Sequence, residues 1–83
     1  MGDVRSAFGQ RVRELRRRKR LSQEQLAARA DLHWTYVSGI ERGVRDPGLR
    51  TMARLATALG VSLSDLVHGL TPAPPKRKGG KAL

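Results

Sequence analysis

The chain has 83 residues, no cysteine and a formal net charge of +10. This length allows one small domain, and the lack of cysteine excludes disulfides, thiolate metal sites and cysteine catalysis. No stretch approaches the roughly 20 apolar residues of a membrane span, and the first residues lack the apolar core of a secretory signal. We therefore expect a cytoplasmic protein with no membrane partner.

The charge is distributed over the whole chain. Residues 1–70 carry 13 Lys and Arg against 7 acidic residues, and residues 71–83 add four cations and no acid. A basic surface suits a polyanion, because each neutralised phosphate releases condensed counterions. A solvated basic face would explain the charge equally well, and charge alone does not distinguish DNA from RNA or anionic lipid.

The first predicted helix covers residues 4–19. Its apolar residues recur at spacings of four, four and three positions, which is the pattern of an inward helical stripe: Val4, Phe8, Val12 and Leu15. Seven of the ten residues in 11–20 are basic, so most of them must face solvent.

Residues 22–43 read as two short helices with a tight break between them. Ser22 can cap the first, which runs to Ala30, and the second covers about His33 to Arg42 with Gly43 suited to a left-handed end. Two helices joined by three or four residues form a helix-turn-helix, whose second helix enters the DNA major groove. An ordinary helical hairpin would fit the periodicity as well.

Two further helices follow a loop at residues 44–48, where Pro47 and Gly48 interrupt regular structure. The fourth helix carries a regular apolar stripe and is closed by Gly60: Leu49, Met52, Leu55, Ala56 and Leu59. Ser62 can cap the fifth, with its own stripe: Leu63, Leu66, Val67 and Leu70. The pattern predicts an all-α domain over residues 1–70. The segment 71–83 has three prolines, two glycines and four cations, so we expect a disordered basic tail.

The segments SQEQLA, LHWTYVSGIERG and PGLRTMARLATALGVSLSDLV make the chain recognisable. Together, in this order, they resemble the phage repressor/Cro-type helix-turn-helix family, often called the XRE family, over about residues 4–69. TYVSGIERG is most similar to the controller proteins of restriction-modification systems. The resemblance implies a compact five-helix repressor-like fold that binds double-stranded DNA. The chain departs from the family at Arg20, where glycine is usual.

The outward face of the third helix is expected to read bases. With Val37 placed inward, Ile40 and Glu41 also face the protein. The face pointing away is small and polar, which suits close approach to base edges or a thymine methyl. The resemblance assigns base contacts to five positions: His33, Trp34, Thr35, Ser38 and Gly39. Trp34 could instead belong in part to the core.

Contacts to the DNA backbone are expected from four residues around this helix: Gln23, Tyr36, Arg42 and Arg45. Gln23 begins a helix, where free N–H groups favour an anion. Each arginine could equally be a plain surface charge. Glu41 would repel phosphate and needs a cation, and the resemblance supplies Arg16 as its partner.

These observations favour a sequence-specific transcription regulator, such as a repressor, acting as a homodimer on a roughly palindromic operator. Aliphatic residues of the fifth helix could form the dimer interface or only cover the monomer core: Leu63, Val67 and Leu70. The alternatives are the antitoxin of a toxin–antitoxin pair and a non-specific nucleic-acid-binding adaptor. No catalytic constellation is visible, and we expect no cofactor, no metal and no small-molecule effector.

Overall fold

The computed structural model describes residues 3–70, so the expected disorder of 71–83 lies outside the described residues. All regular elements within 3–70 are helices: α1 (Val4–Arg18), α2 (Gln23–Ala30), α3 (Trp34–Glu41), α4 (Leu49–Leu59) and α5 (Leu63–Val67). The five-helix, all-α prediction is confirmed. The bounds of two helices differ slightly, since α1 ends one residue earlier than expected and α3 is one residue shorter at each end.

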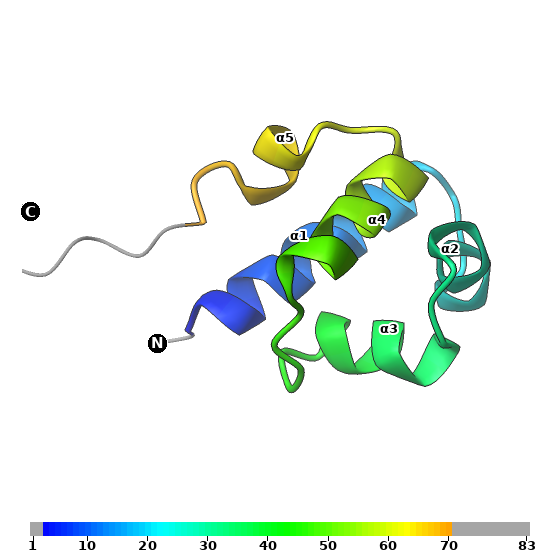
Figure 1. The fold of residues 1–83 in the computed structure, drawn as a ribbon, viewed down its shortest axis with the longest axis horizontal. Helices are drawn as coiled ribbons and strands as arrows, with labels where there is room; N and C mark the ends of the chain where they lie inside the picture. Colours follow the sequence, from blue (N-terminus) through cyan, green and yellow to red (C-terminus); the bar gives the residue numbers. More distant parts are fainter. Residues whose placement is uncertain (1–2, 71–83) are drawn as a thin grey trace, which may run out of the picture.

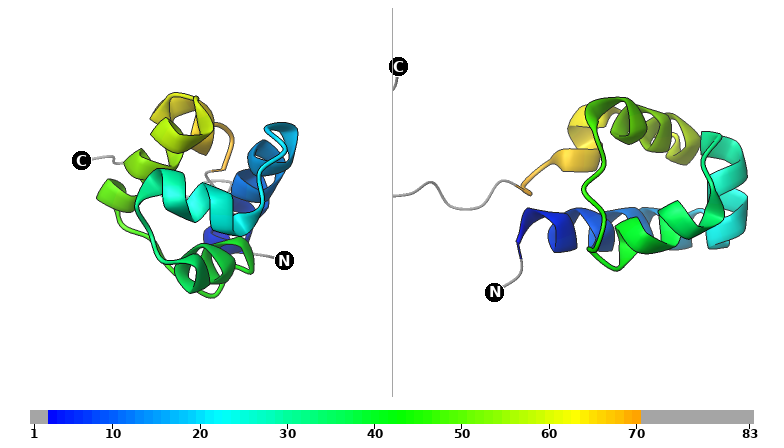
Figure 2. Two further views of the ribbon diagram at one scale, coloured as in Figure 1. Left: turned by 90° about the vertical axis from the view of Figure 1, so that its right-hand side faces the viewer. Right: turned by 60° about the horizontal axis from the view of Figure 1, so that its bottom comes forward.

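The helices pack around α1 and α4 (Figure 1). α2 lies at one end of the molecule and α5 towards the other, while α3 runs along one edge. α1 contacts α3, α4 and α5, and α2 contacts α3 and α4. Seen from the side of α3, α2 runs from the end of α1 to the level of α4 (Figure 2). This arrangement leaves one long side of α3 uncovered by other helices.

Side-chain caps fix where the helices begin. The Ser22 hydroxyl accepts the N–H of Gln25 at 3.0 Å, and the Gln25 side chain accepts the N–H of Ser22 at 2.8 Å. This reciprocal capping box satisfies two free donors at the start of α2. At α5, the Ser62 hydroxyl accepts the N–H of Asp65 at 2.9 Å. The serine caps expected at both helices are therefore present.

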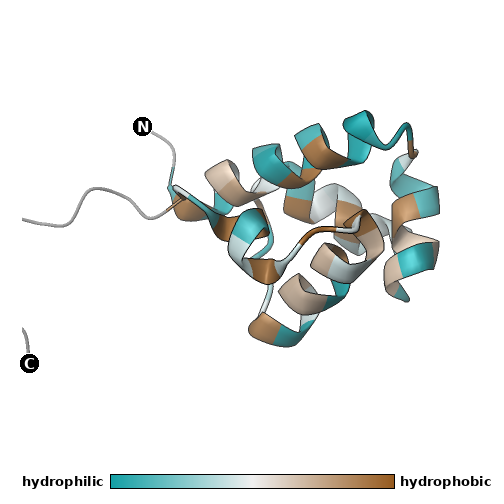
Figure 3. Cartoon of the chain, turned by 90° about the horizontal axis from the view of Figure 1, so that it is seen from above, coloured by the Kyte–Doolittle hydropathy of each residue, from teal (hydrophilic) through white to brown (hydrophobic). Residues whose placement is uncertain are grey.

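The core draws residues from all five helices. Figure 3 shows apolar residues recurring along the helices between hydrophilic ones on the outward sides. The largest fully buried side chains are Val12, Leu26, Val37, Ile40, Leu55, Leu59 and Leu66. Leu66 belongs to α5, so the first four helices do not close the core by themselves.

Arg11 fastens α5 to α1. Its guanidinium donates to the carbonyl oxygens of Asp65 at 2.9 Å and His68 at 2.8 Å. The predicted stripe of the fifth helix extends too far, because α5 ends at Val67 and Leu70 lies beyond it in a turn that contains Gly69 at φ +72°. A glycine at positive φ ends the helical path without steric cost.

The end of α1 is unusual because Arg20 has a φ of +58°. A left-handed conformation costs an ordinary L-residue about 1–2 kcal/mol, whereas glycine adopts it freely. The glycine that is usual in the family at this position would avoid this conformational cost. Arg20 adopts the same conformation at a cost in stability.

Candidate DNA-binding surface

The first turn of α3 projects from the molecule. His33, Trp34 and Thr35 are all exposed, and Trp34 keeps 46% of its surface accessible. Trp34 is also absent from the buried core cluster. The alternative that Trp34 belongs to the core is therefore wrong, and its indole is available to a ligand.

His33 caps α3 through its ring. Its Nδ1 accepts the N–H of Thr35 at 3.2 Å and lies 2.9 Å from the Thr35 hydroxyl oxygen. Because Nδ1 accepts the backbone N–H, the neutral ring carries its proton on Nε2. The contact thus orients both side chains at the tip of the helix and leaves His33 with one donor nitrogen.

The middle of α3 is partly covered. Ser38 is half-buried, and so is Tyr36, whose ring packs against the core cluster. Val37, Ile40 and Glu41 are buried, as the helical wheel predicts. Only part of the outward face is therefore freely accessible.

Gly39 is buried, which contradicts its prediction as an exposed base contact. A Cβ at this position would lie 2.7 Å from Cγ of Arg45, so the arginine side chain passes over the glycine. The helical wheel placed Gly39 correctly on the outward side, but it could not foresee that the following loop folds back. Arg45 itself is exposed and occupies the place where Gly39 was expected to act.

The expected ion pair between Arg16 and Glu41 is present and buried. Nε of Arg16 lies 2.6 Å from one carboxylate oxygen of Glu41, and Nη2 lies 2.9 Å from the other. The two side chains are only 11% and 3% exposed. The hydrogen bond to Glu41 raises the pKa of Arg16 above its ordinary value, while burial acts in the opposite direction. This bidentate geometry is the strong form of such a contact.

Two further contacts complete the Arg16–Glu41 network. Nη1 of Arg16 donates to the carbonyl oxygen of Leu21 at 2.8 Å, and the amide of Gln23 donates to Glu41 at 3.0 Å. Gln23 thereby links the start of α2 to the end of α3. Gln23 was expected only at the DNA backbone; nothing in residue spacing indicates its contact with Glu41.

The other predicted backbone contacts surround the end of α3. Arg42 is exposed and is the residue that terminates the helix. Gly43 follows at φ +77° and lies so close to Ser6 that a Cβ would come within 2.8 Å of the serine hydroxyl oxygen. The chain therefore turns sharply here, which directs Arg45 back along α3.

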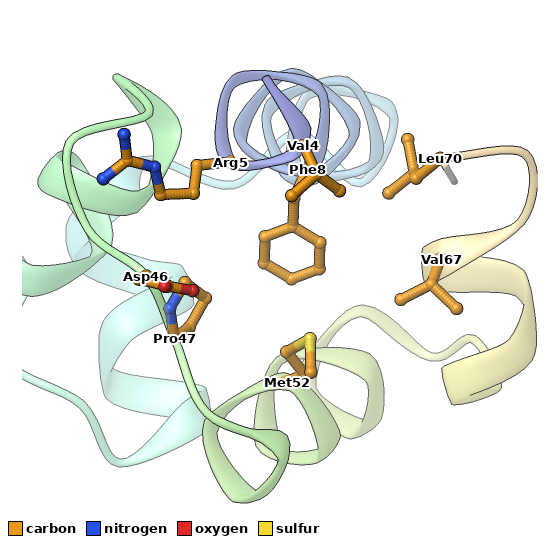
Figure 4. Close-up of a pocket in the computed structure, with 8 residues that line it drawn as sticks. All are labelled: Val4, Arg5, Phe8, Asp46, Pro47, Met52, Val67 and Leu70. Atoms are coloured by element: carbon orange, nitrogen blue, oxygen red, sulfur yellow. The ribbon is translucent and has the colours of Figure 1, made fainter. Parts of the chain in front are cut away.

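The residues expected at the dimer interface are half-buried. Leu63, Val67 and Leu70 all pack against the core cluster, whereas the exposed large apolar residues of the described chain are Val4, Trp34, Val44 and Leu49. Val67 and Leu70 line an apolar cavity of about 350 Å³. In Figure 4 they face Arg5, Asp46 and Pro47 across it, with Phe8 and Met52 between the two sides.

Other kinds of site find no support within residues 3–70. No group of three or more His, Asp and Glu side chains is placed to hold a metal ion. In the same part of the chain no helix combines the length and apolar character needed to cross a membrane.

Comparisons with known proteins agree with this geometry. Residues 12–66 match the helix-turn-helix family model. Control protein C.BamHI of Bacillus amyloliquefaciens is 47% identical over 70 residues, which cover 83% of this chain and 86% of that protein.

Two solved structures are also similar. The restriction-modification controller protein C.AhdI from Aeromonas hydrophila shares 48% identity, with a TM-score of 0.74 over 75% of this chain and 94% of that one. The biofilm regulator SinR, solved in complex with DNA, shares 31% identity, with a TM-score of 0.69 over 72% of this chain and 97% of that one. The chain belongs to the helix-turn-helix family of DNA-binding transcription regulators, and the relatives it resembles include restriction-modification controller proteins.

Proposed function

We propose that the protein regulates transcription as a homodimer that reads a roughly twofold-symmetric operator, with α3 in the major groove. The observation that carries this proposal is the exposed first turn of α3, on a helix whose last turn the buried Arg16–Glu41 network fixes to the rest of the domain. The similarity to control proteins C.BamHI and C.AhdI favours a restriction-modification gene cluster as its setting. A regulator of this kind acts in the cytoplasm and needs no enzymatic activity.

Base contacts are assigned to the exposed and half-exposed residues of α3: His33, Trp34, Thr35 and Ser38. His33 can donate from Nε2 to an acceptor on a base edge, and Trp34 offers an apolar face to a thymine methyl. Arg45 takes the place of Gly39 in this set, because its side chain lies over the glycine.

Backbone contacts are assigned to Gln23, Tyr36 and Arg42. One N–H of the Gln23 amide is bound to Glu41, which leaves the second available for a phosphate oxygen. These contacts would fix the register of the protein on DNA without reading sequence.

Dimerisation is inferred from the short stretch of DNA that a single α3 can contact. One recognition helix contacts only a few base pairs, and paired helices lie about 34 Å apart on successive turns of DNA. The apolar cavity beside α5 supports an interface there, since Val4 at its edge is 48% exposed. Arg5 and Asp46 border the same cavity, so that edge carries both signs of charge, which suits an interface in which the same patch meets itself.

Sequence-specific binding is tested by selecting sites from random DNA. A strong, symmetric preferred site supports the proposal. Equal binding to all sequences would instead indicate a non-specific adaptor.

Dimerisation is tested by adding a charge at the proposed interface. Val67→Glu and Val4→Glu should each shift the protein from dimer to monomer in sedimentation, and operator affinity should fall steeply because two linked half-site contacts become independent. Val4 is the safer position, because it is half exposed and an acid in the first turn of a helix is favourable.

Ser64→Glu is the matched control, because it adds the same charge to α5 at an exposed residue. A Val4→Glu variant that is folded by circular dichroism and still dimeric would place the interface elsewhere.

A further inference from the structure

A second concave surface lies between α2 and α4, away from the residues assigned above. It is a shallow groove of about 370 Å³ whose lining includes three arginines and one acid: Arg29, Ala30, Asp31, Arg50, Ala53, Arg54 and Thr57. All of these residues except Ala30 are exposed. We call the surface formed by Arg29, Arg50 and Arg54 the arginine groove.

The three guanidinium groups lack ion-pair partners. Within residues 3–70 the ion pairs are Arg5–Asp3 and Arg16–Glu41, neither of which involves the groove. Arg54 makes only a long contact of 3.5 Å to the carbonyl oxygen of Asp31. With Asp31 the only acid in the lining, the groove retains a net charge of +2. Three cations on separate turns repel one another, and an anion would relieve that repulsion.

The position of the groove relative to α3 indicates which anion it would meet. α2 begins beside α1, where Gln23 contacts Glu41, and it ends at the level of α4, where Arg29 lines the groove (Figure 2). Asp31 lies two residues before His33, the cap of α3, and Arg50 lies in the first turn of α4. Gln23 and the arginine groove thus lie at opposite ends of α2, the helix that precedes the recognition helix.

A helix in the major groove has a sugar–phosphate strand on each side. Arg50 and Arg54 are four residues apart on α4, so their side chains lie on one face with about 5–6 Å between Cβ atoms. A guanidinium group binds phosphate oxygens through two parallel N–H donors, and the Thr57 hydroxyl adds another donor.

We propose that the arginine groove binds phosphates of the DNA strand on the α4 side of α3, opposite the strand contacted by Gln23. This inference rests on the proposed function and extends it. It makes the DNA contact two-sided, with Arg29, Arg50 and Arg54 as phosphate-binding residues that the helix-turn-helix motif does not contain.

The test compares how steeply operator affinity falls with salt in matched charge-removing variants. Arg29→Gln and Arg54→Gln should each lower the slope of log affinity against log salt by about one, because each removes one phosphate contact. Arg54→Lys should retain the wild-type slope, since the salt dependence counts charges. Glutamine is a good helix former, so circular dichroism and melting should remain unchanged.

Arg18→Gln is the control with the same loss of charge. Arg18 is exposed on α1 and lies about 120° around the helix from Val12, on the opposite side from Arg16. Its removal should leave the slope unchanged. Phosphate ethylation interference gives a second readout: the phosphates that lose importance in Arg54→Gln should lie on the strand opposite those that lose importance in Gln23→Ala.

Two outcomes separate this inference from the proposed function. If wild-type protein selects a preferred site but the Arg29→Gln/Arg54→Gln double variant has the same slope as Arg18→Gln, the groove does not contact DNA and the inference is wrong. An acidic protein partner would then be the better occupant. If wild-type protein shows no preferred site at all, the proposed function itself fails.

Discussion

The two halves of α3 differ in their exposure and in the contacts that hold them. Its first turn is exposed and is organised by a local contact, in which His33 caps the helix through Thr35. Its last turn is buried and is held from outside, by Arg16 and Gln23 on Glu41. α1 can approach the last turn closely only because residue 9 is glycine, since a Cβ there would overlap the carbonyl oxygen of Ile40. The first half can therefore change without unfolding the domain, whereas the second half cannot.

Removing the support of the buried last turn of α3 should have the largest effect on stability. Arg16→Met leaves the Glu41 carboxylate buried without its cation, and we expect a loss of about 3–5 kcal/mol in the free energy of unfolding. Arg18→Met should change it by less than about 0.5 kcal/mol, because Arg18 is an exposed surface residue. Thermal melting of both variants measures the difference. Equal melting temperatures would show that Glu41 does not depend on Arg16.

Changes in the exposed half should alter DNA recognition and not folding. Thr35→Ala and Ser38→Ala should each shift base preference by about 1–3 kcal/mol per lost contact. Arg42→Ala should instead weaken binding to all sequences alike. Site selection with each variant distinguishes the two classes, and an unchanged preferred site for both alanine variants would remove Thr35 and Ser38 from the base-reading set.

Gly39 lies between the two halves of α3, and its substitution tests whether Arg45 needs the space above it to bind DNA. Gly39→Ala should leave stability equal or slightly higher, because alanine favours the helix. Its Cβ should displace the Arg45 side chain, at a cost on the order of 1 kcal/mol in DNA binding.

A double-mutant cycle shows whether Gly39→Ala weakens DNA binding through Arg45. If Gly39 acts only by making room for Arg45, then Gly39→Ala should cost nothing further in an Arg45→Ala background. Additive losses would mean that Gly39 approaches the DNA itself.

The smallest effect is expected outside α3, at the end of α1. Arg20→Gly should raise the free energy of unfolding by about 1 kcal/mol, since glycine tolerates the positive φ that Arg20 adopts. Asp31→Gly is the control, because Asp31 has nearly the same φ of +57° but aspartate visits this region more readily. A larger gain at Asp31 than at Arg20, measured by melting, would contradict the strain argument.

The sequence by itself determined the helices and their order. The stripe from Val4 to Leu15 and the serine caps at Ser22 and Ser62 depend on neighbours within about one turn, so they can be read from spacing alone. The inward direction of Glu41 was also visible in the periodicity, but its partner Arg16 came from the family resemblance, because no local pattern joins residues 25 positions apart.

The tertiary structure decided everything that depends on how the helices cross. It placed Trp34 in solvent, covered Gly39 with Arg45, and set Leu66 into the core so that α5 belongs to the monomer. It also joined Gln23 to Glu41 and brought Arg29 from α2 beside Arg50 and Arg54 of α4. These contacts arise between elements that are distant in sequence, and their geometry is set by the packing of the whole core rather than by the residues that make them.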